Sequence, residues 1–305
     1  MGAAPLYYGY KTRGVWGANL KRAYQVSFDR PYMGSGLPTW FELELAYIRW
    51  AEQQGYDVGY ASSLDLHEGR VDPALHRVLS FSGHDEYWSP PMRAAAEQAV
   101  AGGTHLAYLA ANNIYFQIRL EPSAAGTANR TVVCYKEAVD PAPDANGPTI
   151  RWRQLDKDHS RAEQALLGVQ YNGMLAKPVP LVVSSADHWL WAGAGVKDGE
   201  QLPDLVAIEA DGRDHTMPLP PSASQVLLSA SPYPDKMGRG MRTQNTSLYR
   251  TEHGTMVFAA GTFYWPLALS EPGRVDQRVQ IATRNLYDHL LRNPGRTASP
   301  ANPAS

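Results

Sequence analysis

The stretch His76-Arg-Val-Leu-Ser-Phe-Ser-Gly-His-Asp-Glu-Tyr-Trp-Ser-Pro-Pro-Met92 predicts a buried strand, then a polar loop, then the first turn of a helix. Residues 76–82 are the strand, and Ser89 is a typical helix N-cap with two prolines behind it. Between them lies Gly83-His-Asp-Glu-Tyr-Trp88. In an open parallel sheet, ligands bind beyond the carboxyl ends of the strands, where helix N-termini offer free N–H groups. This loop is therefore the expected centre of any chemistry.

The segments on either side continue an alternation of helices and strands. Apolar residues at helical spacing predict a helix over residues 41–51, and residues 56–60 follow as a short strand. Residues 62–67 are expected to form a loop, and residues 104–110 a third strand after the helix that begins at Ser89. Such alternation is typical of a parallel sheet covered by helices. The predicted fold class is therefore α/β, with a mostly parallel sheet and flanking helices.

The chain changes character after this region. Residues 117–250 contain strand-like runs separated by loops rich in proline and glycine, which we interpret as a β-rich extension of the same sheet. Residues 256–260 are another buried strand, and an apolar stripe over residues 279–290 predicts a last helix. We therefore expect a single domain over residues 1–293, followed by a disordered tail over residues 294–305.

Composition narrows the function classes. The formal net charge of −2 argues against a general affinity for nucleic acid or for an anionic membrane. No apolar stretch reaches the length of a membrane span, and the N-terminus lacks a signal-peptide pattern. A single cysteine excludes an internal disulfide framework and a multi-cysteine zinc site. These features fit a cytoplasmic protein.

Several common active-site patterns do not fit the sequence. A cysteine nucleophile needs a strand-to-helix elbow, whereas Cys134 lies within a strand-like run. No G-x-S-x-G elbow, P-loop or strand-linked G-x-G-x-x-G is present. His84 and Glu86 match the H-x-E of zinc deaminases, but the paired cysteines of that family are missing.

The polar residues of the loop have both a functional and a structural interpretation. His84, Asp85 and Glu86 bring an acid, a base and metal donors together, and we favour a function for them. The structural alternative is that a carboxylate caps the helix and that Trp88 belongs to the core. Lys136 ends an apolar strand-like run, where a lysine is costly unless it reaches water or an anion.

A set of short motifs occurs in order along the chain. They are Ser27-Phe-Asp-Arg-Pro-Tyr32, Gly55-Tyr-Asp-Val58, Gly83-His-Asp-Glu-Tyr-Trp-Ser89, Ala111-Asn-Asn-Ile-Tyr115, Cys134-Tyr-Lys136, Leu167-Leu-Gly-Val169 and Ala260-Gly-Thr262. Together they resemble the C-terminal domain of the N,N-dimethylformamidase large (beta) subunit over roughly residues 5–292. The resemblance implies a fold like that of the class I glutamine amidotransferases, without the nucleophilic cysteine.

The resemblance also implies an iron-dependent hydrolase of small N-substituted amides. In the family, a mononuclear iron is held by two tyrosines and one glutamate. Phenolate and carboxylate are hard oxygen donors that suit ferric iron (Fe3+), and such a metal polarises a carbonyl and activates water. By position, Tyr7 and Glu86 match two of these ligands.

Four further residues match polar side chains near the metal. His84 matches a histidine beside it, and Asn112 and Lys136 match polar neighbours. Glu209, in Leu205-Val-Ala-Ile-Glu-Ala-Asp211, matches a downstream glutamate. In a hydrolase, Glu209 or His84 would move protons.

One tyrosine ligand of the family has no counterpart here. It should precede Tyr7, at the end of the first strand, but only six residues do so, and Tyr8 and Tyr10 are in the wrong place. The chain is therefore expected to lack the first strand of the domain. A longer natural chain or another chain would supply that strand, or this copy has lost the metal.

The sequence is consistent with two alternative functions. The first is a metal-dependent hydrolase of a small amide substrate, which the presence of Glu86, His84, Asn112 and Lys136 favours. The second is a non-catalytic homologue that serves as a binding or assembly module, which the missing tyrosine favours. A homo-oligomer and a small partner subunit are both left open.

Overall fold

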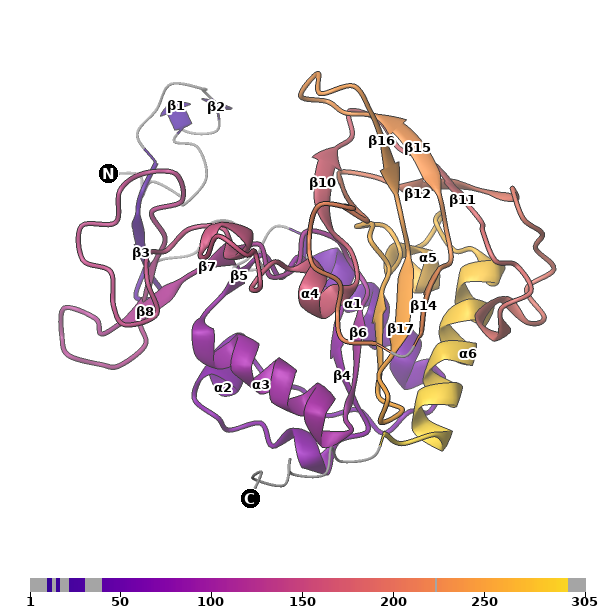
Figure 1. The fold of residues 1–305 in the computed structure, drawn as a ribbon, viewed down its shortest axis with the longest axis horizontal. Coiled ribbons are helices and arrows are strands. Elements are labelled where there is room, and N and C mark those ends of the chain that lie inside the picture. The colour runs from indigo at the N-terminus through magenta and orange to yellow at the C-terminus, as the bar shows by residue number, and fades with distance from the viewer. Residues whose placement is uncertain (1–9, 13–14, 17–21, 31–39, 223, 296–305) are drawn as a thin grey trace.

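The largest sheet in the computed structural model has five strands, in the order β14-β17-β18-β6-β4 (Figure 1). The structure describes residues 10–12, 15–16, 22–30, 40–222 and 224–295. The five strands are β4 (Val78–Phe81), β6 (His105–Tyr108), β14 (Ser224–Leu227), β17 (Ser247–Arg250) and β18 (Met256–Ala259). β18, β6 and β4 run parallel, whereas β14 and β17 are antiparallel to their neighbours. The main sheet is therefore mixed.

The predicted fold class is wrong, because the chain does not form a mostly parallel α/β sheet of the glutamine amidotransferase type. β17 and β18 are joined by a short turn, in which Thr251 N–H donates to Thr255 O over 2.8 Å. A short turn reverses the chain, so the two strands must pair antiparallel. Parallel pairing needs a long crossover, and among the five strands of the main sheet only β4, β6 and β18 are parallel neighbours.

The remaining sheets are small and mostly antiparallel. They pair β1 (Tyr10–Thr12) with β2 (Val15–Trp16), β3 (Gln25–Ser27) with β9 (Thr131–Val133) and β8 (Arg119–Glu121), β10 (Gln170–Met174) with β13 (Glu209–Gly212), β11 (Val179–Val182) with β12 (Gln201–Val206), and β15 (Ser231–Pro234) with β16 (Met241–Gln244). The exception is β5 (Tyr87–Trp88), which pairs parallel with β7 (Phe116–Gln117). The prediction of one domain over residues 1–293 stays a prediction, and most of the predicted tail, residues 296–305, lies outside the described residues.

Helices cover the main sheet. They are α1 (Phe41–Gln53), α2 (Ser63–His67), α3 (Pro90–Gly102), α4 (Gln164–Leu167), α5 (Leu267–Ser270) and α6 (Gln277–Arg292), with 3-10 turns at Pro73–Leu75, Trp152–Gln154 and Trp189–Trp191. α3 begins where the sequence predicts, because Ser89 Oγ accepts from Met92 N–H over 3.4 Å. It ends at Gly103, whose φ of 95° is the left-handed conformation that glycine adopts without strain.

Two local predictions before β4 are wrong. Residues 56–60 form no strand, and residues 62–67, expected to be a loop, include helix α2. Tyr56 packs against Trp50 with ring centroids 5.8 Å apart, and its hydroxyl donates to Asp288 over 3.2 Å. The aromatic side chain fixes this segment to α1 and α6 instead of to a sheet. Ser62 starts α2, because its hydroxyl accepts from Asp65 N–H.

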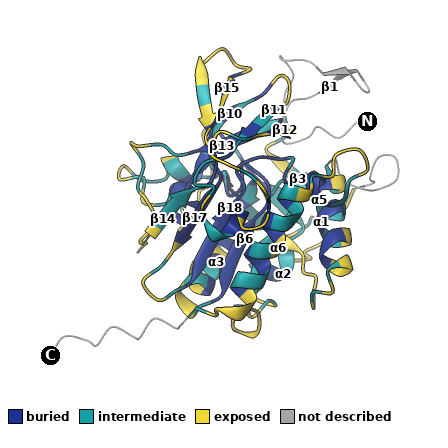
Figure 2. Ribbon diagram, turned by 90° about the vertical axis from the view of Figure 1, so that its right-hand side faces the viewer, coloured by how far each residue is buried: buried dark blue, intermediate teal, exposed yellow. Residues whose placement is uncertain are grey.

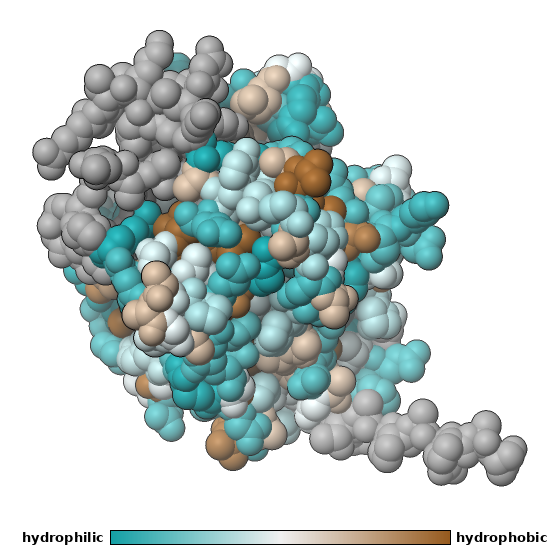
Figure 3. All heavy atoms as spheres, turned by 90° about the vertical axis from the view of Figure 1, so that its left-hand side faces the viewer, coloured by the Kyte–Doolittle hydropathy of each residue, from teal (hydrophilic) through white to brown (hydrophobic). Residues whose placement is uncertain are grey.

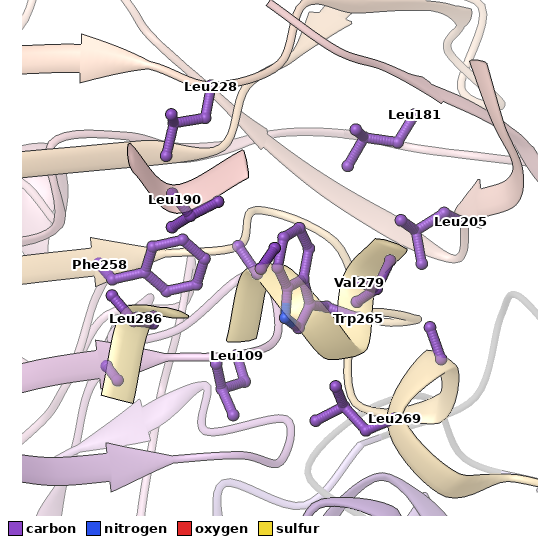
Figure 4. Packing of buried hydrophobic residues seen from close by; sticks show 14 of the residues in the cluster. Leu109, Leu181, Leu190, Leu205, Leu228, Phe258, Trp265, Leu269, Val279 and Leu286 are labelled. Carbon is purple, nitrogen blue, oxygen red and sulfur yellow. The ribbon is translucent and has the colours of Figure 1, made fainter. Parts of the chain in front are cut away.

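The main sheet separates two hydrophobic cores. Alternate residues of β6 point to opposite faces, so Leu106 and Tyr108 join the core under α3, whereas Ala107 joins the core under α6. Figure 4 shows the core under α6, where the Trp265 ring lies between Phe258 and Val279. In Figure 2 the dark blue of buried residues is concentrated in the central strands, and the β15 hairpin carries exposed residues. Both faces of the sheet are thus covered.

The outer surface is mixed in character. On the face shown in Figure 3, apolar residues occur in small groups among hydrophilic ones. Within the described part of the chain, no helix combines the length and apolar character needed to cross a membrane. The predicted cytoplasmic location stays a prediction.

Candidate functional site

Two loops meet where the parallel strands β4 and β6 end. Residues 82–86 follow β4, and residues 109–115 follow β6. Ile114 N–H donates to Asp85 O, and Tyr115 N–H to Glu86 O, both over 2.9 Å. These bonds lead into the pairing of β5 with β7. Because the two strands are parallel neighbours, their carboxyl ends place both loops at the same edge of the sheet.

The centre of the candidate site is His84 between two carboxylates. Its Nε2 lies 3.3 Å from Oε2 of Glu86 and 3.8 Å from Oε2 of Glu209. Glu86 is 4% exposed and the side chain of Glu209 is 15% exposed, so both carboxylates are largely shielded from bulk water. The Phe263 ring contacts the imidazole edge-on, with centroids 4.6 Å apart. Two carboxylates and an imidazole in a sheltered position can share and transfer a proton.

Asn112 connects the loop after β6 to β13. Its side-chain amide donates to Glu209 Oε2 over 2.9 Å, and its backbone N–H donates to Asp211 Oδ1 over 2.8 Å. Glu209 and Asp211 are two residues apart on β13, the spacing that places side chains on one face of a strand. β13 therefore holds Asn112 at two points.

Lys136 completes the group from a different sheet, three residues after the end of β9. Its Nζ donates to the Tyr87 hydroxyl over 2.7 Å and lies 4.6 Å from the centre of the Phe116 ring. Burial lowers the pKa of Lys136, and the negative charge of Glu86 opposes that shift. The site thus combines two carboxylates, an imidazole, an amide and an ammonium.

The mutual positions of these groups change their pKa values. Burial acts to lower the pKa of His84, but the hydrogen bond and charge of Glu86, together with Glu209, raise it above its ordinary value. Burial raises the pKa of Glu209, His84 opposes this, and repulsion from Glu86 adds to it. Desolvation raises the pKa of Asp85 and of Asp211, each to about 7. Strongly shifted pKa values of this kind are common at catalytic sites.

Backbone strain is also concentrated here. Asn112, Ile114, Lys136 and Ile208 have φ values of 55°, 56°, 58° and 65°, in the left-handed region. A β-branched residue rarely adopts this conformation, which costs of order 1–3 kcal/mol per residue. Two isoleucines and two candidate site residues share it, because the loops must turn sharply to bring their side chains together.

The structure brings five of the six predicted site residues together: His84, Glu86, Asn112, Lys136 and Glu209. The sixth, Tyr7, lies outside the described residues, as does Tyr8. The catalytic and metal-binding roles assigned to all six stay predictions.

Two residues that contact the site were not predicted from the sequence. Asp211 accepts a hydrogen bond from the Asn112 backbone N–H. Its position two residues after Glu209 could have indicated this role, since alternate residues of a strand share a face. Phe263 contacts His84, but it lies far along the chain, next to the Ala260-Gly-Thr262 motif, and no local pattern marks it.

The described residues supply only part of the ligand set that the resemblance implies for iron. Glu86 offers the hard carboxylate oxygen that ferric iron prefers, and Glu209 places a second carboxylate nearby. However, the described ranges contain no group of three His, Cys, Asp or Glu side chains that could hold a metal ion. The described donors therefore fit a metal only together with further ligands, such as the predicted Tyr7.

Comparison with known proteins bears directly on the predicted family. A family model described as N,N-dimethylformamidase beta subunit-like, C-terminal, matches residues 2–279. No curated protein matches the chain. The match includes all the motifs from Ser27 to Thr262 and confirms the resemblance. The chain belongs to the N,N-dimethylformamidase beta subunit-like, C-terminal family.

Proposed function

We propose that this protein hydrolyses the C–N bond of a small N-substituted amide at the cluster around His84. The observation that carries the proposal is the placement of the His84 imidazole between Glu86 and Glu209, at the end of two parallel strands. Family membership supports the same reaction class.

Glu209 is suited to be the general base. Its pKa is raised by burial, so it binds a proton more readily than an ordinary glutamate does. It would take a proton from water while the water oxygen bonds to the carbonyl carbon. Asn112 orients its carboxylate through a 2.9 Å hydrogen bond. Proton transfer by a positioned side chain contributes about 10²–10⁴-fold to a rate.

His84 is suited to be the general acid. Glu86 and Glu209 favour its protonated form, which can give a proton to the departing amine as the C–N bond breaks. The products are a carboxylic acid and an amine, and the proton taken by Glu209 restores His84. The ammonium of Lys136 supplies positive charge on the Glu86 side of the site, where the carbonyl oxygen would become negative.

We include ferric iron in the proposal, with Glu86 and Tyr7 as ligands. When bound, such an ion polarises the amide carbonyl and lowers the pKa of a bound water. The charge balance of the described residues is compatible with a cation, because repulsion between the Glu86 and Glu209 carboxylates would be relieved by one.

We also propose that the protein works together with another subunit. The family description names a beta subunit, which implies an assembly for the proteins after which the family is named. Light scattering of the purified chain, alone and after co-expression with genes next to its own, would measure the assembly.

The test of the hydrolase is a panel of small amides, including formamide, N-methylformamide, N,N-dimethylformamide and acetamide, with amine release as the readout. The wild type should act on at least one N-substituted member, and Glu86→Gln should lose that activity and its iron. Glu97→Gln is a matched control, because Glu97 pairs with Arg93 on α3. An inactive wild type that contains iron would contradict the proposed reaction and favour the binding or assembly module.

A further inference from the structure

A second candidate site lies near the end of β13 opposite to its first residue, Glu209. It is a pocket of about 420 Å³ formed by β10, β16 and the residues after β13. Figure 2 shows β10 and β13 below the β15 hairpin. Arg213, which follows the end of β13, and Arg242, on β16, both line it.

The pocket is lined by cations and by no acid. Besides the two arginines, its lining includes His215 and the apolar side chains of Leu227 and Met241, but no aspartate or glutamate among the described residues. Arg153, another partly buried arginine, has an acidic partner in Glu163. The described residues that line the pocket therefore carry a net positive charge.

Both guanidinium groups have unused hydrogen-bonding capacity. The Nε atoms of Arg213 and Arg242 are buried and have no acceptor within the described part of the chain, and neither side chain forms an ion pair there. A buried N–H without an acceptor is destabilising, and a planar guanidinium matches the oxygens of a carboxylate or phosphate. The terminal nitrogens of the two guanidinium groups, rather than the buried Nε atoms, would contact an anion in the pocket.

The walls of the pocket are fixed. Gly212 lies so close to β16 that a Cβ there would collide with the carbonyl oxygen of Thr243 and the side chain of Asn172. Asn172 Nδ2 donates to that same carbonyl over 2.8 Å, and Arg213 N–H donates to Asn245 Oδ1 over 3.1 Å. The backbone that carries the two arginines is therefore held in place by packing and hydrogen bonds. This reduces the conformational entropy that is lost when a ligand binds.

We propose that this pocket binds a small organic anion. Arg213 and Arg242 would contact its carboxylate or phosphate group, and Leu227 and Met241 would contact its apolar part. The site is chemically opposite to the acidic cluster at Glu209, and the proposal does not rest on amide hydrolysis.

Isothermal titration with inorganic phosphate, acetate and benzoate tests the proposal at constant ionic strength. The wild type should bind at least one of them saturably at one site, and benzoate more tightly than acetate because of the apolar wall. Arg213→Gln and Arg242→Gln should each weaken binding roughly tenfold or more, the effect of losing a charge-assisted hydrogen bond. Arg292→Gln is the control, because Arg292 is 76% exposed and pairs with Asp288.

Two outcomes would overturn the proposal. One is the absence of saturable binding of all three anions to the wild type. The other is equal affinity in the wild type and the double glutamine variant. If the double variant does not fold by circular dichroism, the Arg213→Lys, Arg242→Lys pair keeps the charges but not the planar fork, and it should still bind more weakly than the wild type.

Discussion

The side-chain amide of Asn112 donates a hydrogen bond to Oε2 of Glu209 over 2.9 Å. The two residues are 97 positions apart, and the contact joins the loop after β6 to the first residue of β13. The same Glu209 oxygen lies 3.8 Å from Nε2 of His84. Asn112 thus fixes the carboxylate that faces the imidazole, and the arrangement of the site depends on β13 as much as on the loop after β4.

His84 should titrate above its ordinary value of 6.5. A proton NMR titration of the histidine ring signals would measure this, and Glu86→Gln should lower the pKa because it removes the main favourable charge. Since the folded pKa is the higher one, the stabilisation from this histidine is fully present below pH 6.5 and is lost as the pH rises through the folded pKa. A His84 pKa at or below 6.5 in the wild type would contradict the described geometry.

Asp211 should make the protein less stable as the pH rises from acid towards neutral. Burial raises its folded pKa to about 7 from the ordinary 3.8, so the unfolded chain loses this proton first. Stability that is present below pH 3.8 is therefore lost as the pH approaches 7. Asp211→Asn keeps an acceptor for Asn112 N–H and should flatten this part of the profile, as measured by urea unfolding at several pH values.

Asp211→Ala separates the charge of Asp211 from its hydrogen bond. It leaves the Asn112 N–H buried without its acceptor, which costs about 1–3 kcal/mol of unfolding free energy. The alanine variant should thus be less stable than the asparagine variant at pH 7. Equal stability of the two would show that the Asn112–Asp211 bond contributes little.

Cys134 should be unreactive in the folded protein. Its side chain is fully buried, and burial raises its thiol pKa from 9.0 to about 12, so the thiolate fraction falls about a thousandfold. Labelling with iodoacetamide at pH 8 should be slow in buffer and fast in guanidinium chloride. Rapid labelling of the native protein would mean that the core between β7 and β9 opens readily.

The elements with local signals were predicted best. Ser89, Pro90 and Pro91 mark the beginning of α3, and each acts within one turn of the chain. The direction of the strands in the main sheet has no such local signal. β18 pairs with β6 across about 150 residues, and β17 reverses beside β18 through a short turn. No local pattern distinguishes parallel from antiparallel addition at the edge of a sheet, which is why a mostly parallel sheet was expected.

Part of the candidate site was predictable, because some of its residues follow strands that local sequence patterns identify. His84, Glu86 and Asn112 follow strands that the apolar runs identify, and the rule that ligands bind at the carboxyl ends of parallel strands applies to them. Glu209 comes from another sheet, and only the family resemblance pointed to it, whereas the position of Lys136 at the end of an apolar run also marked that residue. Phe263 reaches His84 through tertiary packing, which sequence spacing does not encode.

The most direct test of the account is the initial rate of amine release from the best N-substituted amide by the wild type and by Glu209→Gln. Glutamine keeps an oxygen that can accept from Asn112, but it cannot take a proton from water. We predict an unchanged circular dichroism spectrum and a rate about 10²–10⁴-fold lower, the usual contribution of a general base. A Glu209→Gln variant that releases amine at the wild-type rate would contradict the central claim that this carboxylate, with His84, performs the proton transfers of amide hydrolysis.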